Sequence, residues 1–141
     1  MKNKTSLLLM EQLVMVLVFA LAAALCLQVF VLSDQMSRRG EMRDRAVVQV
    51  QNMAETLKSC HGNFAESAQA LGGTWDGTCW KIGYDRDWQP AEGDACAYLV
   101  RADLLREDAP LLGGAAVSAQ AADGEILFGI EVFWQEVAGD A

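Results

Sequence analysis

Residues 7–31 read LLLMEQLVMVLVFALAAALCLQVFV, an apolar run that decides how the rest of the chain can fold. Residues 13–32 include no charged side chain, and Gln28 is the only strongly polar one. A helix rises about 1.5 Å per residue, so this stretch spans roughly 30 Å, the thickness of the hydrocarbon core of a bilayer. A helix also satisfies its own backbone hydrogen bonds in lipid. The run therefore predicts a transmembrane helix over residues 7–32.

Cleaved signals are the competing interpretations of this run. A secretory signal has a shorter apolar region and a small-residue cleavage site, whereas here the run is long and Glu11 stands near its start. A lipoprotein signal would place a small residue before Cys26, and Leu25 stands there. The basic residues on the two flanks do not decide the orientation. The short N-terminal tail and the acidic remainder of the chain favour a cytoplasmic N-terminus.

The helix is expected to continue over residues 33–59, outside the membrane. This stretch contains no proline and a single glycine, Gly40, at which the helix is expected to be weakened or bent. Apolar residues recur every three or four positions, as on one face of an amphipathic helix. They are Met42, Ala46, Val50, Met53 and Leu57, and the stripe is widened by Val47 and Ala54. Glycine predicts the end of the helix near residues 59–62.

Residues 60–141 are expected to form a small β-rich domain. A short helix is indicated over residues 63–71, and the strand signals fall at residues 78–84, 95–101, 115–121 and 125–137. Asp123 and Gly124 mark a hairpin between the last two strands. About 80 residues are marginal for an independent core, so the apolar stripe should complete it. The predicted fold class is α+β, a long N-terminal helix packed on an antiparallel sheet of three or four strands.

Composition and spacing disfavour several classes of function. The net charge is −8, and residues 33–141 hold 18 acidic residues against 9 basic ones. Binding to nucleic acid would need clustered Lys and Arg, so no direct nucleic-acid binding is expected. The single histidine, His61, directly follows Cys60, which is the spacing of no common zinc site. Four acidic residues crowd one loop but match no EF-hand pattern: Asp85, Asp87, Glu92 and Asp94.

No nucleophilic triad or phosphate-binding glycine loop is evident in the sequence. We therefore predict no catalytic residue, metal site or cofactor, and we expect that the protein is not an enzyme. The aromatic residues are expected to fill a core rather than to bind a ligand. They are Trp75, Trp80, Trp88, Trp134, Tyr84 and Tyr98.

The cysteines allow at most one disulfide outside the apolar run. Cys26 lies within that run, and three cysteines remain. Cys79 and Cys96 lie on consecutive predicted strands, and a disulfide between them would close a loop of about 18 residues. Pairing with Cys60, or free buried thiols, are the alternatives, and in each case the role would be structural.

The N-terminal pattern resembles that of type IV pilins and of the pseudopilins of type II secretion and competence systems. Those precursors have a short basic leader, a cleavage point, four mostly apolar residues, a glutamate and about 20 apolar residues. Here Ser6 would be the last leader residue, Leu7 the first mature residue and Glu11 the fifth. The family usually has glycine and phenylalanine at the cleavage point, and this sequence departs from it at both positions.

The resemblance implies cleavage between Ser6 and Leu7 by a prepilin peptidase, followed by methylation of the new amine. It implies that Glu11 pairs with the amino terminus of a neighbouring subunit during assembly. The expected organisation is a leader (1–6), a transmembrane helix (7–32), its amphipathic extension (33–59) and an extracytoplasmic β-rich domain (60–141). The expected partners are the membrane, other pilin or pseudopilin subunits, the prepilin peptidase and an assembly platform protein.

The function implied is that of a pilin-like or pseudopilin subunit, of the minor kind, in a type IV pilus, type II secretion or competence filament. It would be a single-pass protein of the cell membrane, present in an extracellular filament after assembly. The alternative is a single-pass membrane protein whose acidic extracytoplasmic domain binds or senses a ligand and does not polymerise.

Overall fold

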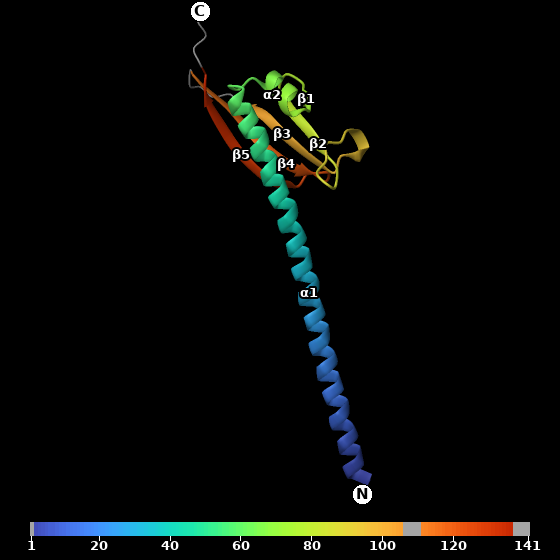
Figure 1. Cartoon of the computed structure of the whole chain (residues 1–141). Helices are drawn as coiled ribbons and strands as arrows, with labels where there is room; N and C mark the ends of the chain where they lie inside the picture. The colour runs from blue at the N-terminus through green and yellow to red at the C-terminus, as the bar shows by residue number, and fades with distance from the viewer. Residues whose placement is uncertain (1, 106–110, 137–141) are drawn as a thin grey trace, which may run out of the picture. The chain divides into compact units, whose positions relative to one another are not determined.

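A computed structural model describes residues 2–105 and 111–136 (Figure 1). The chain separates into two compact units, Met1–Gly40 and Glu41–Ala141, and the second unit is called the head below. The elements in chain order are α1 (Lys2–Ser59), α2 (Phe64–Leu71), β1 (Thr74–Trp75), β2 (Cys79–Tyr84), the 3-10 turn η1 (Gly93–Ala95), β3 (Tyr98–Leu105), β4 (Leu112–Ala121) and β5 (Ile126–Gln135). The long N-terminal helix and the short second helix are both confirmed.

The described strands form one antiparallel sheet in the order β1-β2-β3-β4-β5. Each strand pairs with the next along the chain, so the sheet is a simple meander. The α+β fold class is confirmed, with five strands instead of the three or four expected. The additional strand is β1, whose two residues pair with Trp80 and Lys81. A segment of two residues is too short to show an alternating pattern, which explains why the sequence did not reveal it.

The third and fourth strands of this sheet begin at other residues than expected. The strand predicted at residues 95–101 starts at Tyr98 and continues to Leu105, because η1 occupies the residues before it. The strand predicted from Ala115 starts at Leu112 and contains Gly113 and Gly114. A Cβ on Gly113 would overlap the Trp134 ring, and one on Gly114 would overlap the Phe133 ring. Glycine permits this close approach of side chain to backbone, which is a common reason for glycine within a strand.

The core of the head lies between the sheet and the last part of α1. The predicted stripe is confirmed: its members at 46, 50, 53, 54 and 57 are buried, and those at 42 and 47 are half-buried. Alternate residues of the strands face this stripe, as the two-residue period of a strand requires. The buried ones are Trp80, Ile82, Tyr84, Val100, Ala102, Ala115, Val117, Ala119, Val132 and Trp134. The head is therefore held together by one helix face and one sheet face.

A tight turn joins α1 to α2 and locks the end of α1 to the sheet. The Gly62 N–H donates to the carbonyl of Leu57 at 2.9 Å, which closes the helix end. Gly62 has a φ of 80°, and a Cβ there would overlap the indole of Trp134. Asn63 then caps α2 by accepting the N–H of Glu66 at 3.2 Å. Both a backbone requirement and a packing requirement thus select glycine at position 62.

Aromatic side chains fill both ends of this core, as expected. Near β1, Phe64 stacks on Trp75 with their ring centroids 4.5 Å apart. At the other end of β2, Trp88 stacks on Tyr98 at 4.3 Å. The Tyr84 hydroxyl lies 3.1 Å from Oε1 of Gln49 and donates to it, which ties the sheet to α1. The aromatic residues therefore act mainly as packing, in line with the prediction from their number.

Candidate assembly segment

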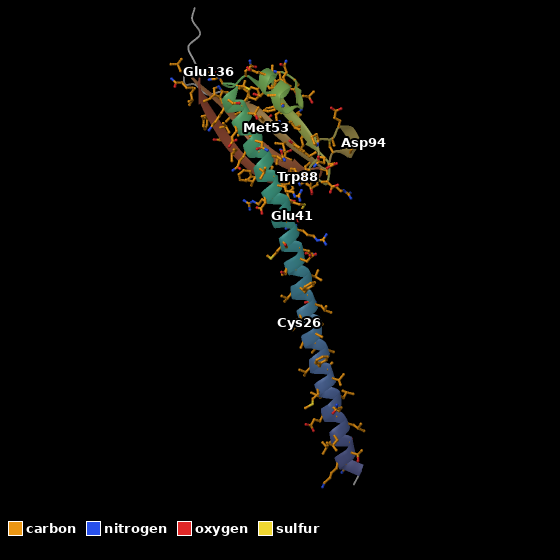
Figure 2. All side chains as sticks on the ribbon, viewed as in Figure 1. Cys26, Glu41, Met53, Trp88, Asp94 and Glu136 are labelled. Carbon is orange, nitrogen blue, oxygen red and sulfur yellow. The ribbon has the colours of Figure 1, made fainter. Side chains whose placement is uncertain are left out.

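The apolar run of α1 is not covered by any of the residues that the structure describes. Among residues 3–40, every side chain is exposed, and the large apolar ones range from Val14 at 49% to Phe19 at 76%. Figure 2 shows side chains standing out from the ribbon around Cys26, whereas Met53, farther along the same helix, is fully buried. By length and composition this helix is able to cross a membrane, a test that an N-terminal signal sequence also passes.

The exposure of this run has a large energetic consequence. Leaving one Leu, Val or Phe side chain in water rather than burying it costs about 1.5–3 kcal/mol. More than a dozen such side chains are exposed between Leu7 and Leu32, so the sum far exceeds the stability of a typical domain. The surroundings that make this helix stable must therefore come from outside the described chain, either as lipid or as other apolar helices.

The three residues singled out near the N-terminus all lie on α1 and are exposed. Ser6 and Leu7 occupy its second turn, and Glu11 follows one turn after Leu7. Glu11 makes no ion pair with the side chains that the structure describes. In lipid an isolated carboxylate is costly and normally pairs with a cation. A cation that pairs with Glu11 must therefore come from a group other than the described side chains.

The disulfide expected between Cys79 and Cys96 is not formed in this structure, in which all four cysteines are free. Cys79 is opposite Asp103 at one end of the β2–β3 pair, while Cys96 precedes the Tyr84–Tyr98 pair at the other end. Five residues of strand separate these ends, which is roughly 17 Å at about 3.3 Å per residue. A disulfide needs Cα atoms closer than about 7 Å, so the antiparallel register rules this pairing out.

A charged pair beside Cys79 is the feature that sequence reasoning missed. Arg101 donates to the carboxylate of Asp103, and both side chains are about one-third exposed. The two residues are two positions apart on β3, which places them on the same face of the sheet. That spacing is the signal by which the sequence could have revealed the pair. Nε of Arg101 is buried and has no hydrogen-bond partner among the described atoms.

Cys79 itself is unsuited to nucleophilic chemistry. Burial raises the pKa of its thiol, and the neighbouring Asp103 carboxylate raises it further. A thiol reacts as the thiolate, so a raised pKa keeps Cys79 protonated and unreactive at neutral pH. The contact with Arg101 lowers the pKa of the Asp103 carboxyl and keeps it charged. The cluster is a polar patch of the sheet with no activated nucleophile.

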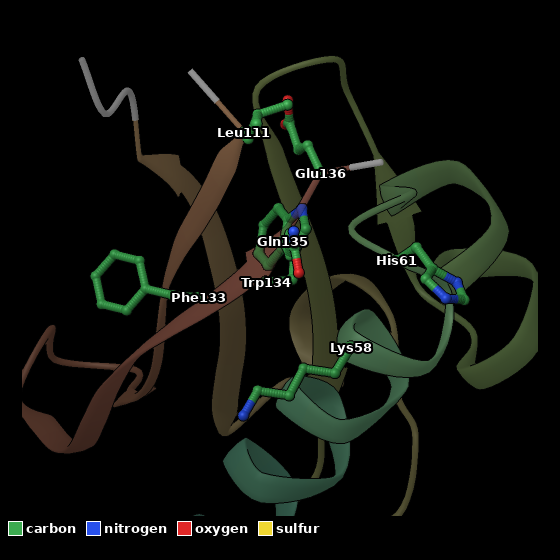
Figure 3. Close-up of a pocket in the computed structure, with 7 residues that line it drawn as sticks. All are labelled: Lys58, His61, Leu111, Phe133, Trp134, Gln135 and Glu136. Atoms are coloured by element: carbon green, nitrogen blue, oxygen red, sulfur yellow. The ribbon is translucent and has the colours of Figure 1, made fainter. Parts of the chain in front are cut away.

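A hollow lies at the end of α1 (Figure 3). It encloses about 730 Å³ and is lined by Lys58, His61, Leu111, Phe133, Trp134, Gln135 and Glu136. His61 and Phe133 lie on opposite sides of it. Across residues 2–105 and 111–136, no group of three or more His, Cys, Asp or Glu side chains is arranged to hold a metal ion. The described lining of the hollow includes Lys58, His61 and Glu136 but no serine, threonine or cysteine.

The acidic loop after β2 is organised by its own backbone. Oδ1 of Asp85 accepts the N–H groups of Asp87 and Gln89, each at 2.9 Å. Trp88, which lies between Asp87 and Gln89 in the sequence, has a φ of 60° and packs against the core with an exposed fraction of 7%. Oδ1 of Asp85 closes the turn, as aspartate side chains commonly do. The loop therefore positions Trp88 in the core.

Comparisons of this chain with protein-family models, with characterised proteins and with solved structures found no match. A long N-terminal helix with an apolar first part, packed on an antiparallel sheet, is a pilin-like architecture. The likeness to pilins rests on this architecture.

Proposed function

We propose that the chain is a pilin-like or pseudopilin subunit, of the minor kind, in a filament of the type IV pilus, type II secretion or competence type. Its N-terminal helix inserts in the cell membrane and then packs against the helices of other subunits. The head is extracytoplasmic, and the role of the protein is assembly rather than catalysis. A prepilin peptidase and an assembly platform protein would be its further partners.

The observation that carries this proposal is the contrast within α1. Residues 3–40 expose their apolar side chains, while residues 41–59 of the same helix contribute one face to the core of the head. A helix that is apolar all round belongs in lipid or in a helical bundle. A subunit that moves from the membrane into a filament core needs both surroundings in turn.

Glu11 gives the proposal its chemical detail. A carboxylate in lipid is stabilised by pairing with a cation that is also poorly hydrated, since the pair offsets both desolvation costs. Cleavage after Ser6 would create a positively charged amine at Leu7 in every subunit. Glu11 of one subunit would then pair with that amine of a neighbour, and the pair would fix the axial register of the two helices, as buried polar groups do in coiled coils.

Mass spectrometry of the mature N-terminus tests the processing step. The protein is purified from membranes of cells that carry its own secretion or pilus genes. We expect a chain that begins with methylated Leu7. An assembled protein that still begins at Met1 would overturn both the cleavage and the amine-pairing role.

Replacement of Glu11 tests the assembly step. In Glu11→Gln, the side chain keeps its size and loses its charge, so assembly into sheared filaments should fall strongly while membrane insertion is unchanged. Gln12→Ala is the matched control, because it alters the adjacent exposed polar residue without touching the carboxylate. Normal assembly of Glu11→Gln would remove the pairing role. Absence of the wild-type chain from sheared filaments would instead favour a membrane sensor that does not polymerise.

A further inference from the structure

The two edges of the sheet are protected very differently. At the β2 edge, β1 covers Trp80 and Lys81, and Pro90 forms a bridge to Tyr84. The Ala91 N–H also donates to the Gly83 carbonyl at 2.9 Å. Proline offers no N–H to a further strand, and a strand of two residues offers almost no template. This edge therefore has the features by which proteins prevent further pairing.

The β5 edge has neither a proline nor a covering strand over its ten described residues, and its pairing with β4 is irregular at one point, between Ile126 and Phe128. Its sequence, ILFGIEVFWQ, contains no proline and no basic residue, and its single charge is Glu131. Within the described residues β5 pairs only with β4, and Figure 1 shows it at the margin of the sheet. About five backbone N–H groups and five carbonyls of such a strand point away from its one neighbour. Long unprotected edges of this kind are templates for an added strand.

The side chains of β5 are also only partly covered. On the face toward α1, Val132 and Trp134 are buried, but Phe128 and Ile130 are half-buried. Gly129 is exposed and has no side chain to hinder the approach of another backbone. A sixth strand beside β5 would cover Phe128 and Ile130 with its own inward-facing residues. The added strand should therefore be apolar at every second position.

The charges along β5 indicate what kind of strand would fit. Glu125, Glu131 and Glu136 are all exposed, and no basic residue lies between positions 125 and 136. If β5 paired with β5 of a second copy over its full length, Glu125 of each copy would lie opposite Glu136 of the other. Like charges directly opposite each other destabilise a strand pair. Charge complementarity thus favours a basic segment of a different protein over a second copy.

We propose that the free edge of β5 is a β-augmentation site for an extended segment of another protein, in which apolar residues alternate with Lys or Arg. Main-chain hydrogen bonds to β5 supply the attachment, and a basic residue opposite Glu131 supplies selectivity. The proposal goes beyond assembly through α1 and does not depend on it, because β5 belongs to the head and would be available in a membrane-bound subunit.

The test uses the full chain in neutral detergent micelles and a fluorescein-labelled peptide of ten residues in which valine alternates with lysine or threonine. A second peptide replaces each lysine by glutamate. A third keeps the basic sequence but has alternate backbone nitrogens methylated, which removes the N–H groups that a strand needs. We expect saturable binding of the first peptide, measured by fluorescence anisotropy, and slower amide exchange in residues 126–135. We expect no binding of the methylated peptide.

Glu131→Lys should weaken binding of the basic peptide by about threefold to tenfold and favour the acidic one, as cross-strand charge pairs predict. Glu92→Lys makes the same charge change in an exposed loop, and it should leave both affinities unchanged. Equal losses in the two variants, or equal binding of the methylated peptide, would overturn the proposal. So would protection from exchange that lies outside β5.

Discussion

The two halves of α1 both carry large apolar side chains, but only one half has them covered by the chain itself. Leu17 is 55% exposed, and Leu57, on the same helix, is 0% exposed. Beyond Gly40 the apolar residues other than the exposed Val48 gather on one face, and the sheet covers that face. Before Gly40 they surround the helix on every side, and no face of it differs enough from the others to pack on a single sheet.

The two halves of α1 therefore determine different properties of the protein. The spacing in residues 41–59 specifies the fold of the head, because a one-sided stripe needs a one-sided partner. The continuous apolar surface of residues 7–32 specifies surroundings instead of a partner within the chain. The predictions below alter one half at a time and measure whether the other responds.

The largest effect is expected from truncating a side chain that the sheet covers. Leu57→Ala removes a fully buried side chain and should lower the free energy of unfolding of the head by about 2–5 kcal/mol, because it leaves a cavity. Leu17→Ala makes the same chemical change in the uncovered half and should leave that value within about 0.5 kcal/mol. Urea denaturation in detergent, followed by tryptophan fluorescence, measures both. A comparable loss in Leu17→Ala would mean that the head depends on the upstream half.

The next effect concerns the end of the covered half. Gly62→Ala forces a side chain against the Trp134 indole at a φ of 80°, and it should cost about 2–4 kcal/mol through strain and overpacking. Gly77→Ala is the matched control, since Gly77 has a φ of 97° but nothing within 4 Å of a Cβ. It should cost only about 1 kcal/mol, from backbone strain. The difference between the two variants, measured by thermal unfolding, isolates the contact with Trp134.

The sequence was sufficient for the parts of the molecule that depend on periodicity. The stripe from Met42 to Leu57 predicts which helix face is buried, since spacing by three and four has one structural meaning. The apolar run likewise predicts a helix without a polar face. Both are properties of consecutive residues, and they do not depend on how distant segments meet.

The sequence was insufficient where distant residues decide the structure. Gly113 and Gly114 indicate a loop locally, but in the structure they belong to a strand and pack closely against the rings of Trp134 and Phe133, which come much later in the chain. Cys79 and Cys96 appear suitable for pairing until the register puts them at opposite ends of one ladder. The β5 edge becomes evident only when the order of the strands is known. Processing at Ser6 and pairing by Glu11 depend on other proteins and stay predictions.

A smaller effect should distinguish the head by its response to acid. The contact with Arg101 depresses the folded-state pKa of Asp103 below the usual value of an aspartate. The resulting stability is present above pH 4 and is lost as the pH falls through the folded pKa. Because the pair is about one-third exposed, its contribution should be below about 1 kcal/mol. The pKa of Asp76 is also lowered, because its carboxylate accepts the backbone N–H groups of Thr78 and Cys79.

The pH dependence of unfolding in Asp103→Asn measures this contribution. The variant should be less stable than the wild type at pH 7, and the difference should shrink as the pH falls through the folded-state pKa of Asp103. Arg101→Met should flatten the same part of the curve, and the double variant should add little to either single change. Independent, additive losses in the double variant would show that the two side chains do not act as a pair.

The smallest effect is expected at Gly40, where the two halves of α1 meet. Gly40 is exposed, and a Cβ there would have nothing within 4 Å, so Gly40→Ala should stabilise the helix locally by about 0.5–1 kcal/mol. Amide exchange of residues 37–44 should slow severalfold, while the urea midpoint of the head stays unchanged, since no buried contact is altered. Ser37→Ala, three residues earlier on the same exposed helix, controls for helix propensity and should have a smaller effect. Faster exchange in Gly40→Ala would show that the added methyl group meets a neighbour, and the glycine would then be a point of close contact with another helix instead of a weak point of this one.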